Sequence, residues 1–141
     1  MNEQDRLPLS VVMIAHNEAH RLRRSLGSVV GLASEIIVVH NDCTDETEQI
    51  AREEFGARTY EHPWHGQQEQ KQIALDYASQ PWVLLLDADE ELSPTLKRSL
   101  ERFIQEDDPA FAGAYFARKV WFLGRWITHG DWYPDETLRL V

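Results

Sequence analysis

One stretch near the middle of the chain, WVLLLDADEEL at residues 82–92, constrains the fold more than any other. Its five leading apolar residues are far too few for a membrane span, which needs about 20, and they run directly into a cluster of carboxylates. A short apolar run of this kind indicates a buried strand. We therefore predict a strand whose carboxyl end delivers acidic side chains to a site.

Two of these carboxylates are candidate metal ligands. Alternate side chains of an extended chain point to opposite faces, so Asp87 and Asp89 can point one way while the small Ala88 points the other. Oxygen ligands favour Mg²⁺, Mn²⁺ or Ca²⁺ over zinc, and Mg²⁺ takes one or two carboxylates and completes its shell with phosphate oxygens and water. The residues leave open an alternative, an acidic loop that only solvates the strand end and caps the next helix.

Length and charge narrow the class of protein. The 141 residues suffice for one domain with a core, and 43% of them are hydrophobic. A formal net charge of -10 argues against a nucleic-acid binder, because phosphate backbones are held by clustered Lys and Arg. An acidic protein that binds a phosphorylated ligand needs a cation between the two, and a metal on Asp87 or Asp89 would supply it.

Cysteine content and the N-terminal residues bear on the cellular compartment. Cys43 is the only cysteine, so the chain forms no internal disulfide and no thiolate metal site. The first residues lack a signal-peptide pattern, and no apolar run has the length of a spanning helix. We expect a cytoplasmic protein and leave peripheral membrane contact open.

Strand and helix signals alternate along the first 104 residues. Apolar runs predict strands at 9–15, 35–39 and 82–86, and we expect a short strand at 57–61. Helical spacing predicts helices at 19–30, 45–54, 67–78 and 93–104. Asp45 with Glu48 predicts a capping box for the second helix, and Gly56 is placed to end it. Ser93 predicts the cap of the fourth helix. Further on, the spacing predicts a strand at 114–122, a turn around Gly124 and another strand at 138–141.

This alternation predicts an α/β fold with a mostly parallel, Rossmann-like sheet and helices on both faces. Ligands of such sheets bind outside the carboxyl ends of the strands, at the point where the strand order reverses. Three of the predicted strands end in polar residues, at 15–18, 40–45 and 87–91. If these three ends share one edge of the sheet, they form one site.

The motifs at these strand ends, taken together, resemble a known family. AHNE at 15–18, HNDCTDET at 40–47, QK at 70–71 and WVLLLDADEEL resemble the nucleotide-diphospho-sugar domain of family 2 glycosyltransferases, which has the GT-A fold. The later stretch FLGRWITHGDWYPDETLRLV, at 122–141, is similar to the branch of bacterial lipopolysaccharide core glycosyltransferases. The resemblance covers nearly the whole chain from Leu9.

The resemblance assigns roles at the donor site. Ala15, Asn17 and Glu18 match the segment that lines the nucleotide pocket. Asp87 matches a carboxylate near the ribose, and Asp89 matches the carboxylate that binds a metal, Mg²⁺ or Mn²⁺, on the diphosphate. Two further positions, Lys71 and Asp135, are assigned to charge neutralisation and to proton transfer.

Lys71 matches a basic residue that neutralises phosphate, and Asp135 is our candidate catalytic base. The implied activity is transfer of a sugar from a nucleotide-diphosphate sugar to a glycan or glycolipid hydroxyl, with inversion, in lipopolysaccharide or cell-envelope glycan synthesis.

The sequence departs from the family pattern after the second strand and at its end. Where the family has two carboxylates, or Asp-Ser, this chain has His40 and Asn41, and Asp42 replaces a Gly. The Asn41 amide both donates and accepts, so it can still bond a pyrimidine edge as a substrate-binding residue. The family pattern continues past Val141, so we expect a single domain at 1–141 with the donor half and the start of the acceptor half, truncated at its C-terminus.

Two other functions remain to be weighed. A phosphatase with an aspartyl nucleophile also uses a D-x-D strand end, but usually on the first strand and followed by Thr or Val, whereas here Glu90 follows on the fourth strand. The second is a non-catalytic module, either a fragment that binds the nucleotide sugar or a half-domain that completes its sheet by self-association. That module would bind nucleotide without turnover and could form a homo-oligomer.

Overall fold

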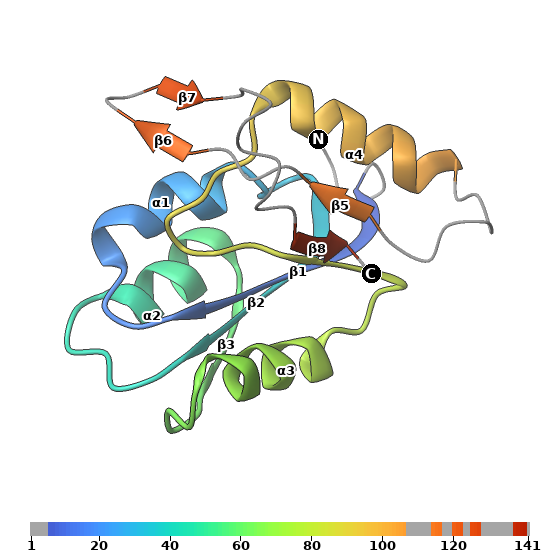
Figure 1. Ribbon diagram of the computed structural model, residues 1–141. Coiled ribbons are helices and arrows are strands. Elements are labelled where there is room, and N and C mark those ends of the chain that lie inside the picture. Colours follow the sequence, from blue (N-terminus) through green and yellow to red (C-terminus); the bar gives the residue numbers. More distant parts are fainter. Residues whose placement is uncertain (1–5, 107–113, 117–119, 123–124, 128–136, 141) are drawn as a thin grey trace.

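The computed structural model describes residues 6–106, 114–116, 120–122, 125–127 and 137–140, with side chains up to residue 105 (Figure 1). The strands are β1 (Leu7–Ala15), β2 (Ala33–His40), β3 (Arg58–Glu61), β4 (Trp82–Leu85), β5 (Ala114–Phe116), β6 (Val120–Phe122), β7 (Arg125–Ile127) and β8 (Thr137–Leu140). The helices are α1 (Ala19–Gly27), α2 (Thr47–Gln49) continued by the π-helical η2 (Ile50–Glu54), α3 (Gln67–Tyr77) and α4 (Pro94–Glu106).

The main sheet has the strand order β3-β2-β1-β4-β8-β5. β1 pairs in parallel with both β2 and β4, and β2 pairs in parallel with β3. The chain therefore runs outward from β1 to β3 and then returns to place β4 on the other side of β1. The strand order reverses between β1 and β4, which is the place where sheets of this kind bind ligands.

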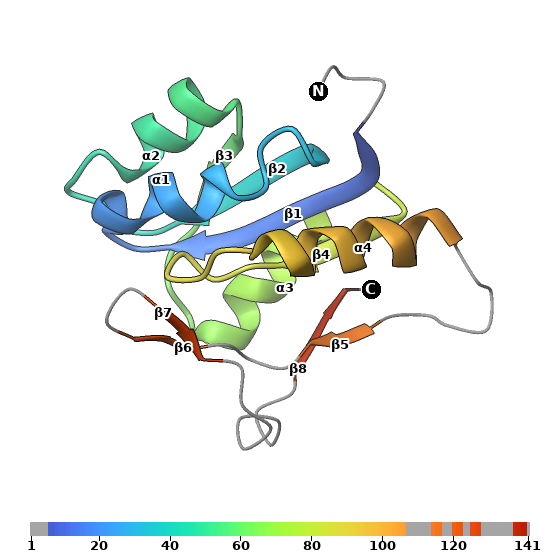
Figure 2. The ribbon, with the colours of Figure 1, turned by 90° about the horizontal axis from the view of Figure 1, so that it is seen from above.

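Helices cover both faces of the sheet, as Figures 1 and 2 show, with α1, η2 and α4 on one face and α3 on the other. Alternating side chains of the buried strands supply the two cores. Val11 and Met13 of β1 belong to the core under α1 and α4, whereas Val12 belongs to the core under α3. The prediction of a mostly parallel sheet with helices on both faces is confirmed.

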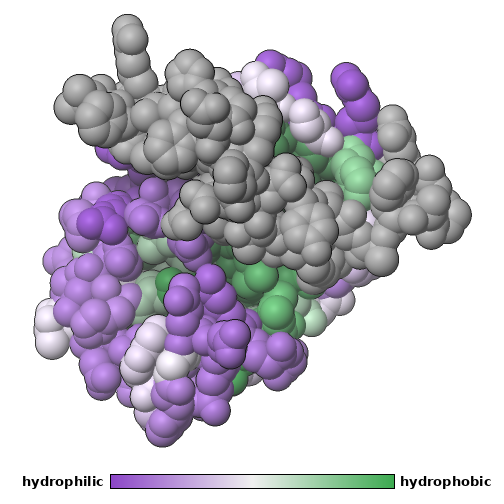
Figure 3. All heavy atoms as spheres, viewed as in Figure 1, coloured by the Kyte–Doolittle hydropathy of each residue, from purple (hydrophilic) through white to green (hydrophobic). Residues whose placement is uncertain are grey.

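Few large apolar side chains of the described part of the chain reach the surface. Figure 3 shows a largely hydrophilic outer surface with hydrophobic residues in a band across the middle of the view. Trp64, Val30 and Tyr77 are the large hydrophobic residues that remain exposed among those described. Tyr77 stacks on Tyr60 at a ring separation of 3.7 Å. Within the described ranges, no helix combines the length and apolar character that crossing a membrane requires.

The predicted capping box at the second helix is wrong. The Asp45 carboxylate accepts hydrogen bonds from the backbone N–H groups of Thr47 and Ala19, and Glu48 bonds Arg52 at 2.8 Å instead of reaching back to Asp45. α2 starts at Thr47 without a side-chain cap. Asp45 thus links two loops, a long-range contact that local spacing does not reveal.

Other predicted helix boundaries agree with the structure. Gly56 has φ of +68° and follows η2, and the backbone N–H of Leu96 donates to Ser93 Oγ at 3.1 Å at the start of α4. A left-handed residue ends a helix most cheaply when it is glycine, because there is no Cβ to clash.

The predicted single strand at 114–122 is also wrong. β5 pairs antiparallel with β8 in the main sheet, whereas β6 pairs antiparallel with β7 in a separate two-stranded sheet. Trp121 lies opposite Trp126 in that pairing, and the predicted turn around Gly124 lies outside the described residues. Continuous β propensity through 114–122 hides a change of sheet, because propensity does not specify the pairing partner. The predicted last strand is confirmed as β8.

A buried carboxylate joins four segments at the amino edge of the sheet. Glu35 of β2 accepts hydrogen bonds from Ser10 Oγ of β1 at 2.5 Å and from the backbone N–H and hydroxyl of Ser79 at 3.0 and 2.8 Å. Arg58 of β3 lies 3.3 Å from the other carboxylate oxygen. Burial opposes ionisation of Glu35, but these donors and the charge of Arg58 outweigh it, so the pKa of Glu35 lies below its ordinary value.

We expect Glu35→Gln to lower the free energy of unfolding by about 1–3 kcal/mol at pH 7, because charge-assisted hydrogen bonds are lost. The folded-state pKa lies below the ordinary 4.5, so the stabilisation is present above that pH and is lost as the pH falls through the folded value. Urea unfolding followed by tryptophan fluorescence from pH 7 to pH 3 measures the difference. Glu61 is an exposed residue of β3, so Glu61→Gln is the control. If the loss of unfolding free energy in Glu35→Gln does not vary with pH, the assignment is contradicted.

Candidate functional site

The three predicted polar strand ends converge at the carboxyl edge of the sheet. They line one pocket of about 260 Å³ beside the point where the strand order reverses. Five of the residues predicted for the donor site line it, namely Ala15, Glu18, Asn41, Asp87 and Asp89. The pocket therefore draws on the ends of β1, β2 and β4, as the single-site prediction requires.

The segment after β4 leaves the extended conformation, because Ala88 and Asp89 form a turn. Leu86 and Ala88 are buried in the core, whereas Asp87 and Asp89 face the pocket. Glu90 closes the turn, since its carboxylate accepts the backbone N–H of Asp87 at 2.9 Å and its own N–H donates to the Asp87 carbonyl at 3.0 Å. One acidic residue thus shapes the loop and leaves Asp87 and Asp89 to present their carboxylates from the same side.

Lys71 of α3 contributes a positive charge next to this loop. Its Nζ lies 3.9 Å from Asp87 Oδ1, and both side chains are about one third exposed or less. A pair of this length and exposure contributes little to stability. The structure therefore brings together the cation and the carboxylate that the sequence assigned to the donor site.

A hydrogen-bonded clamp fixes the loop after β1 against the loop after β2. Asn17, with φ of +52°, accepts the backbone N–H of Thr44 at 2.8 Å on its side-chain oxygen. The Thr47 hydroxyl accepts the Glu18 N–H at 2.9 Å and donates to Asp45. Burial raises the pKa of Asp45 less than its hydrogen bonds from Thr47 and Ala19 lower it, so the pKa lies below the ordinary value. Asn17 shapes the loop rather than lining the pocket.

Asn41 is the buried polar residue at the end of β2. Its backbone N–H donates to the Ala15 carbonyl at 3.3 Å, and its carbonyl accepts the ring N–H of His16 at 2.8 Å. Only 8% of Asn41 is exposed, and its side-chain amide has no hydrogen-bond partner in the described part of the chain. The amide donor and acceptor are thus available to a ligand in the pocket.

Asp42 has φ of +47°, in the region that glycine adopts most easily. The resemblance places Gly at this position, and Asp42 adopts a backbone conformation that glycine tolerates.

Six further residues line the pocket, namely Ile14, His16, Arg21, Trp64, Gln67 and Ala88, and of these Arg21, Trp64 and Gln67 lie outside the predicted strands and their polar ends. Arg21 Nη1 lies 3.6 Å from Glu18 Oε2, three residues away on α1, a spacing that could have indicated the pair. Trp64 is 49% exposed on the loop before α3. Nothing in local periodicity distinguishes an exposed Trp from a core Trp, so the tertiary position of this loop was needed.

Metal ligands within the described residues are few. No group of three or more His, Cys, Asp or Glu side chains there could hold an ion, so Asp87 and Asp89 are the carboxylates that the pocket offers beside Glu18. Such a partial ligand set suits Mg²⁺ or Mn²⁺, which take one or two carboxylates and complete their shell with substrate phosphates and water. Asp135, the predicted base, lies outside the described residues.

Comparison with curated proteins identifies relatives. The chain is 33% identical over 140 residues to the lipopolysaccharide core biosynthesis glycosyltransferase LpsC of Rhizobium meliloti, which covers 96% of this chain and 51% of LpsC. It is 42% identical over 93 residues to an uncharacterized glycosyltransferase of Rickettsia bellii, covering 66% of this chain and 31% of that protein. The chain thus spans about a third to a half of the length of these relatives.

Solved structures share the fold. The mannosyltransferase PcManGT of Pyrobaculum calidifontis, with GDP-Man and Mn²⁺, matches with a TM-score of 0.60 and 21% identity over 77% of this chain and 34% of that chain. TarS of S. aureus, with UDP-GlcNAc, matches with a TM-score of 0.59 and 23% identity over 70% of this chain and 31% of that chain. Glucosyl-3-phosphoglycerate synthase of Mycobacterium tuberculosis, with Mn²⁺ and UDP, matches with a TM-score of 0.51 and 27% identity. This match covers 60% of this chain and 36% of that chain.

The family itself follows from a match along almost the whole sequence. The family model described as Glycosyl transferase family 2 matches residues 10–140, a range that contains every strand end of the pocket. This match, the similarity to LpsC and the shared GT-A fold agree with one another. The chain belongs to glycosyl transferase family 2.

Proposed function

We propose that the pocket at the carboxyl edge binds a nucleotide-diphosphate sugar and that the protein transfers this sugar to an acceptor hydroxyl. One observation carries the proposal: Asn41, Asp87 and Asp89, from strand ends far apart in the sequence, line a single pocket where the strand order reverses. Relatives of the same fold bind UDP-GlcNAc, UDP and GDP-Man. The similarity to LpsC supports a glycan or glycolipid acceptor in lipopolysaccharide or cell-envelope synthesis.

Asp89, with Asp87 beside it, would hold a divalent ion. The described pocket supplies too few ligands to enclose an ion without a substrate, which fits a Mg²⁺ or Mn²⁺ that shares its shell with phosphate. Mn²⁺ accompanies the nucleotide in two of the similar solved structures. When bound, such an ion neutralises the diphosphate and stabilises the nucleoside diphosphate as a leaving group.

The other residues divide the work of binding and proton transfer. Asn41 offers a donor and an acceptor to the base, and Lys71 supplies positive charge next to Asp87. Glu18 lines the same pocket, with its backbone held by Thr47. We assign the general base to Asp135, which takes the proton of the acceptor hydroxyl as that oxygen attacks the anomeric carbon from the face opposite the leaving group, with inversion.

The metal assignment predicts the behaviour of Asp89→Asn. We expect isothermal titration with UDP, GDP and CMP to show Mn²⁺-dependent binding of at least one nucleotide to the unchanged chain. The variant removes a ligand charge, so the affinity in Mn²⁺ should fall at least about tenfold, or about 1.4 kcal/mol. Glu91→Gln, in the same acidic loop but outside the pocket lining, is the control. Equal Mn²⁺-dependent affinity in both variants would contradict the assignment.

The Asn41 amide predicts which nucleobase the pocket prefers. Uracil and cytosine each present a donor next to an acceptor, which one amide can match, whereas guanine presents two adjacent donors that suit a carboxylate. We expect Asn41→Asp to weaken UDP relative to GDP by about tenfold, because one hydrogen bond becomes a repulsive contact. Competition titrations measure the ratio of the UDP and GDP affinities. Gln105→Glu, at an exposed position of α4, adds the same charge away from the pocket and is the control. An unchanged ratio shows that Asn41 does not contact the base.

The assignment of Asp135 as the general base predicts that Asp135→Asn separates nucleotide binding from sugar transfer. Transfer of radiolabelled sugar to a glycolipid acceptor should fall about 10²–10⁴-fold, the usual contribution of a general base, while nucleotide affinity stays unchanged. Asp131→Asn, in the same stretch, is the control. Nucleotide binding without transfer by the unchanged chain would instead support the non-catalytic donor-binding module, an outcome to consider because the chain spans 31–51% of the lengths of these two relatives.

A further inference from the structure

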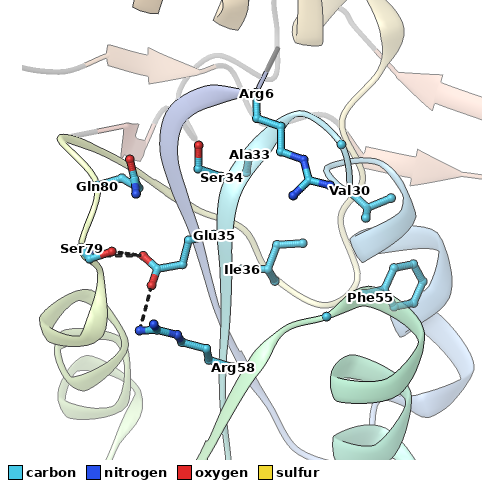
Figure 4. Close-up of a pocket in the computed structure, with 12 residues that line it drawn as sticks. Arg6, Val30, Ala33, Ser34, Glu35, Ile36, Phe55, Arg58, Ser79 and Gln80 are labelled. Atoms are coloured by element: carbon cyan, nitrogen blue, oxygen red, sulfur yellow. Dashed lines mark hydrogen bonds and ion pairs between the residues drawn. The ribbon is translucent and has the colours of Figure 1, made fainter. Parts of the chain in front are cut away.

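A second pocket lies at the opposite edge of the sheet from the donor site (Figure 4). Its volume is about 250 Å³, and it is formed by the amino ends of β2 and β3 with the segments that precede β1 and β4. Ile36 of β2 lines this pocket and Asn41, just after β2, lines the donor pocket, so at about 3.3 Å per residue the two linings lie about 16 Å apart along the strand. The second pocket is therefore distinct from the nucleotide site.

Arg6 is the unusual residue of this pocket. Its Nε is buried and has no hydrogen-bond partner among the described residues, and no described carboxylate pairs with its guanidinium. Figure 4 shows the side chain extending over the pocket toward Val30. A guanidinium carries five donors and cannot lose its proton, so leaving it partly buried without a counter-ion is costly.

The carboxylate of the pocket is already engaged. Glu35 accepts three hydrogen bonds from Ser10 and Ser79 and pairs with Arg58 at 3.3 Å. Figure 4 shows this pair at the side of the pocket away from the Arg6 guanidinium. The described lining of the pocket thus carries two guanidinium groups and one carboxylate, which leaves one positive charge in a chain whose formal net charge is -10.

The remaining walls leave room for a ligand and offer it further contacts. The side-chain amide of Gln80 has no hydrogen-bond partner in the described ranges, whereas Ile36 and Phe55 supply apolar surface. Gly31 has φ of +85°, and a Cβ built there would meet no atom within 4 Å. The lining is thus polar at Gln80 and apolar at Ile36 and Phe55, and the space beside Gly31 is open.

We propose that this pocket binds a small anion through a carboxylate or phosphate group, with Arg6 as its main ligand. The planar guanidinium fork matches the paired oxygens of both groups. The volume of about 250 Å³ lies below the range of roughly 300–1,000 Å³ typical of drug-sized ligands, so the occupant is small. The proposal is independent of the sugar-transfer activity.

Titration calorimetry at constant ionic strength tests the proposal, with inorganic phosphate in one arm and succinate in the other. The arm with the tighter binding identifies the preferred group. Arg6→Met keeps the length of the side chain and removes its charge, so we expect affinity to fall at least tenfold. Arg98→Met removes an exposed arginine of α4 outside the pocket and should leave affinity unchanged.

Two further measurements keep the test decisive. Gln80→Glu adds a negative charge at the pocket wall without altering Arg6, so it should weaken both anions even if Arg6→Met fails to fold. Adding UDP with Mn²⁺ should not displace the bound anion. No binding of either anion to the unchanged chain, equal affinity in the folded Arg6 variant, unchanged affinity in Gln80→Glu, or displacement by UDP would each overturn the proposal.

Discussion

The parallel pairing of β1 with β2 on one side and β4 on the other is the constraint on which the rest of the structure depends. β1 is buried on both faces, so its register fixes both cores at once, and a shift by one residue would exchange them. The same register sets the donor pocket. Ala15 ends the central strand, and Asn41 and Asp87 follow its two neighbours, so these two residues lie about 10 Å apart across the sheet at a strand spacing of about 4.8 Å.

Polar contacts secure both ends of this strand. At its amino end, Ser10 joins β1 to Glu35 and to the loop before β4. At its carboxyl end, Asn17 and Asp45 hold the loop after β1 against the loop after β2. Each contact joins residues more than 20 positions apart. The helices fill the two faces, but these bonds hold the loops of the donor pocket in position.

The sequence was sufficient for the elements whose signals are local. Apolar runs identify β1, β2 and β4, because strands buried on both faces are apolar throughout, whereas the edge strand β3 is short, partly exposed and mixed in composition. The polar residues that follow β1, β2 and β4 are also recognisable from the sequence, and they supply most of the pocket lining. Signals that depend on distant partners were misread or missed. Asp45 has the spacing of a helix cap but bonds Ala19, and Trp64 reaches the pocket through the position of its loop. The change of sheet between β5 and β6 depends on pairing, which propensity does not encode.

Under the proposed function, the charge of the pocket calls for a cation. The described pocket lining carries three carboxylates, those of Glu18, Asp87 and Asp89, against one guanidinium, that of Arg21, so a diphosphate alone would be repelled. Lys71 is 3.9 Å from Asp87, a loose and partly exposed pair that is cheap to separate. A divalent ion held by the two aspartates would offset the attraction that Asp87 exerts on Lys71. The ammonium group would then be available to the phosphate, so that metal and lysine would both neutralise the leaving group.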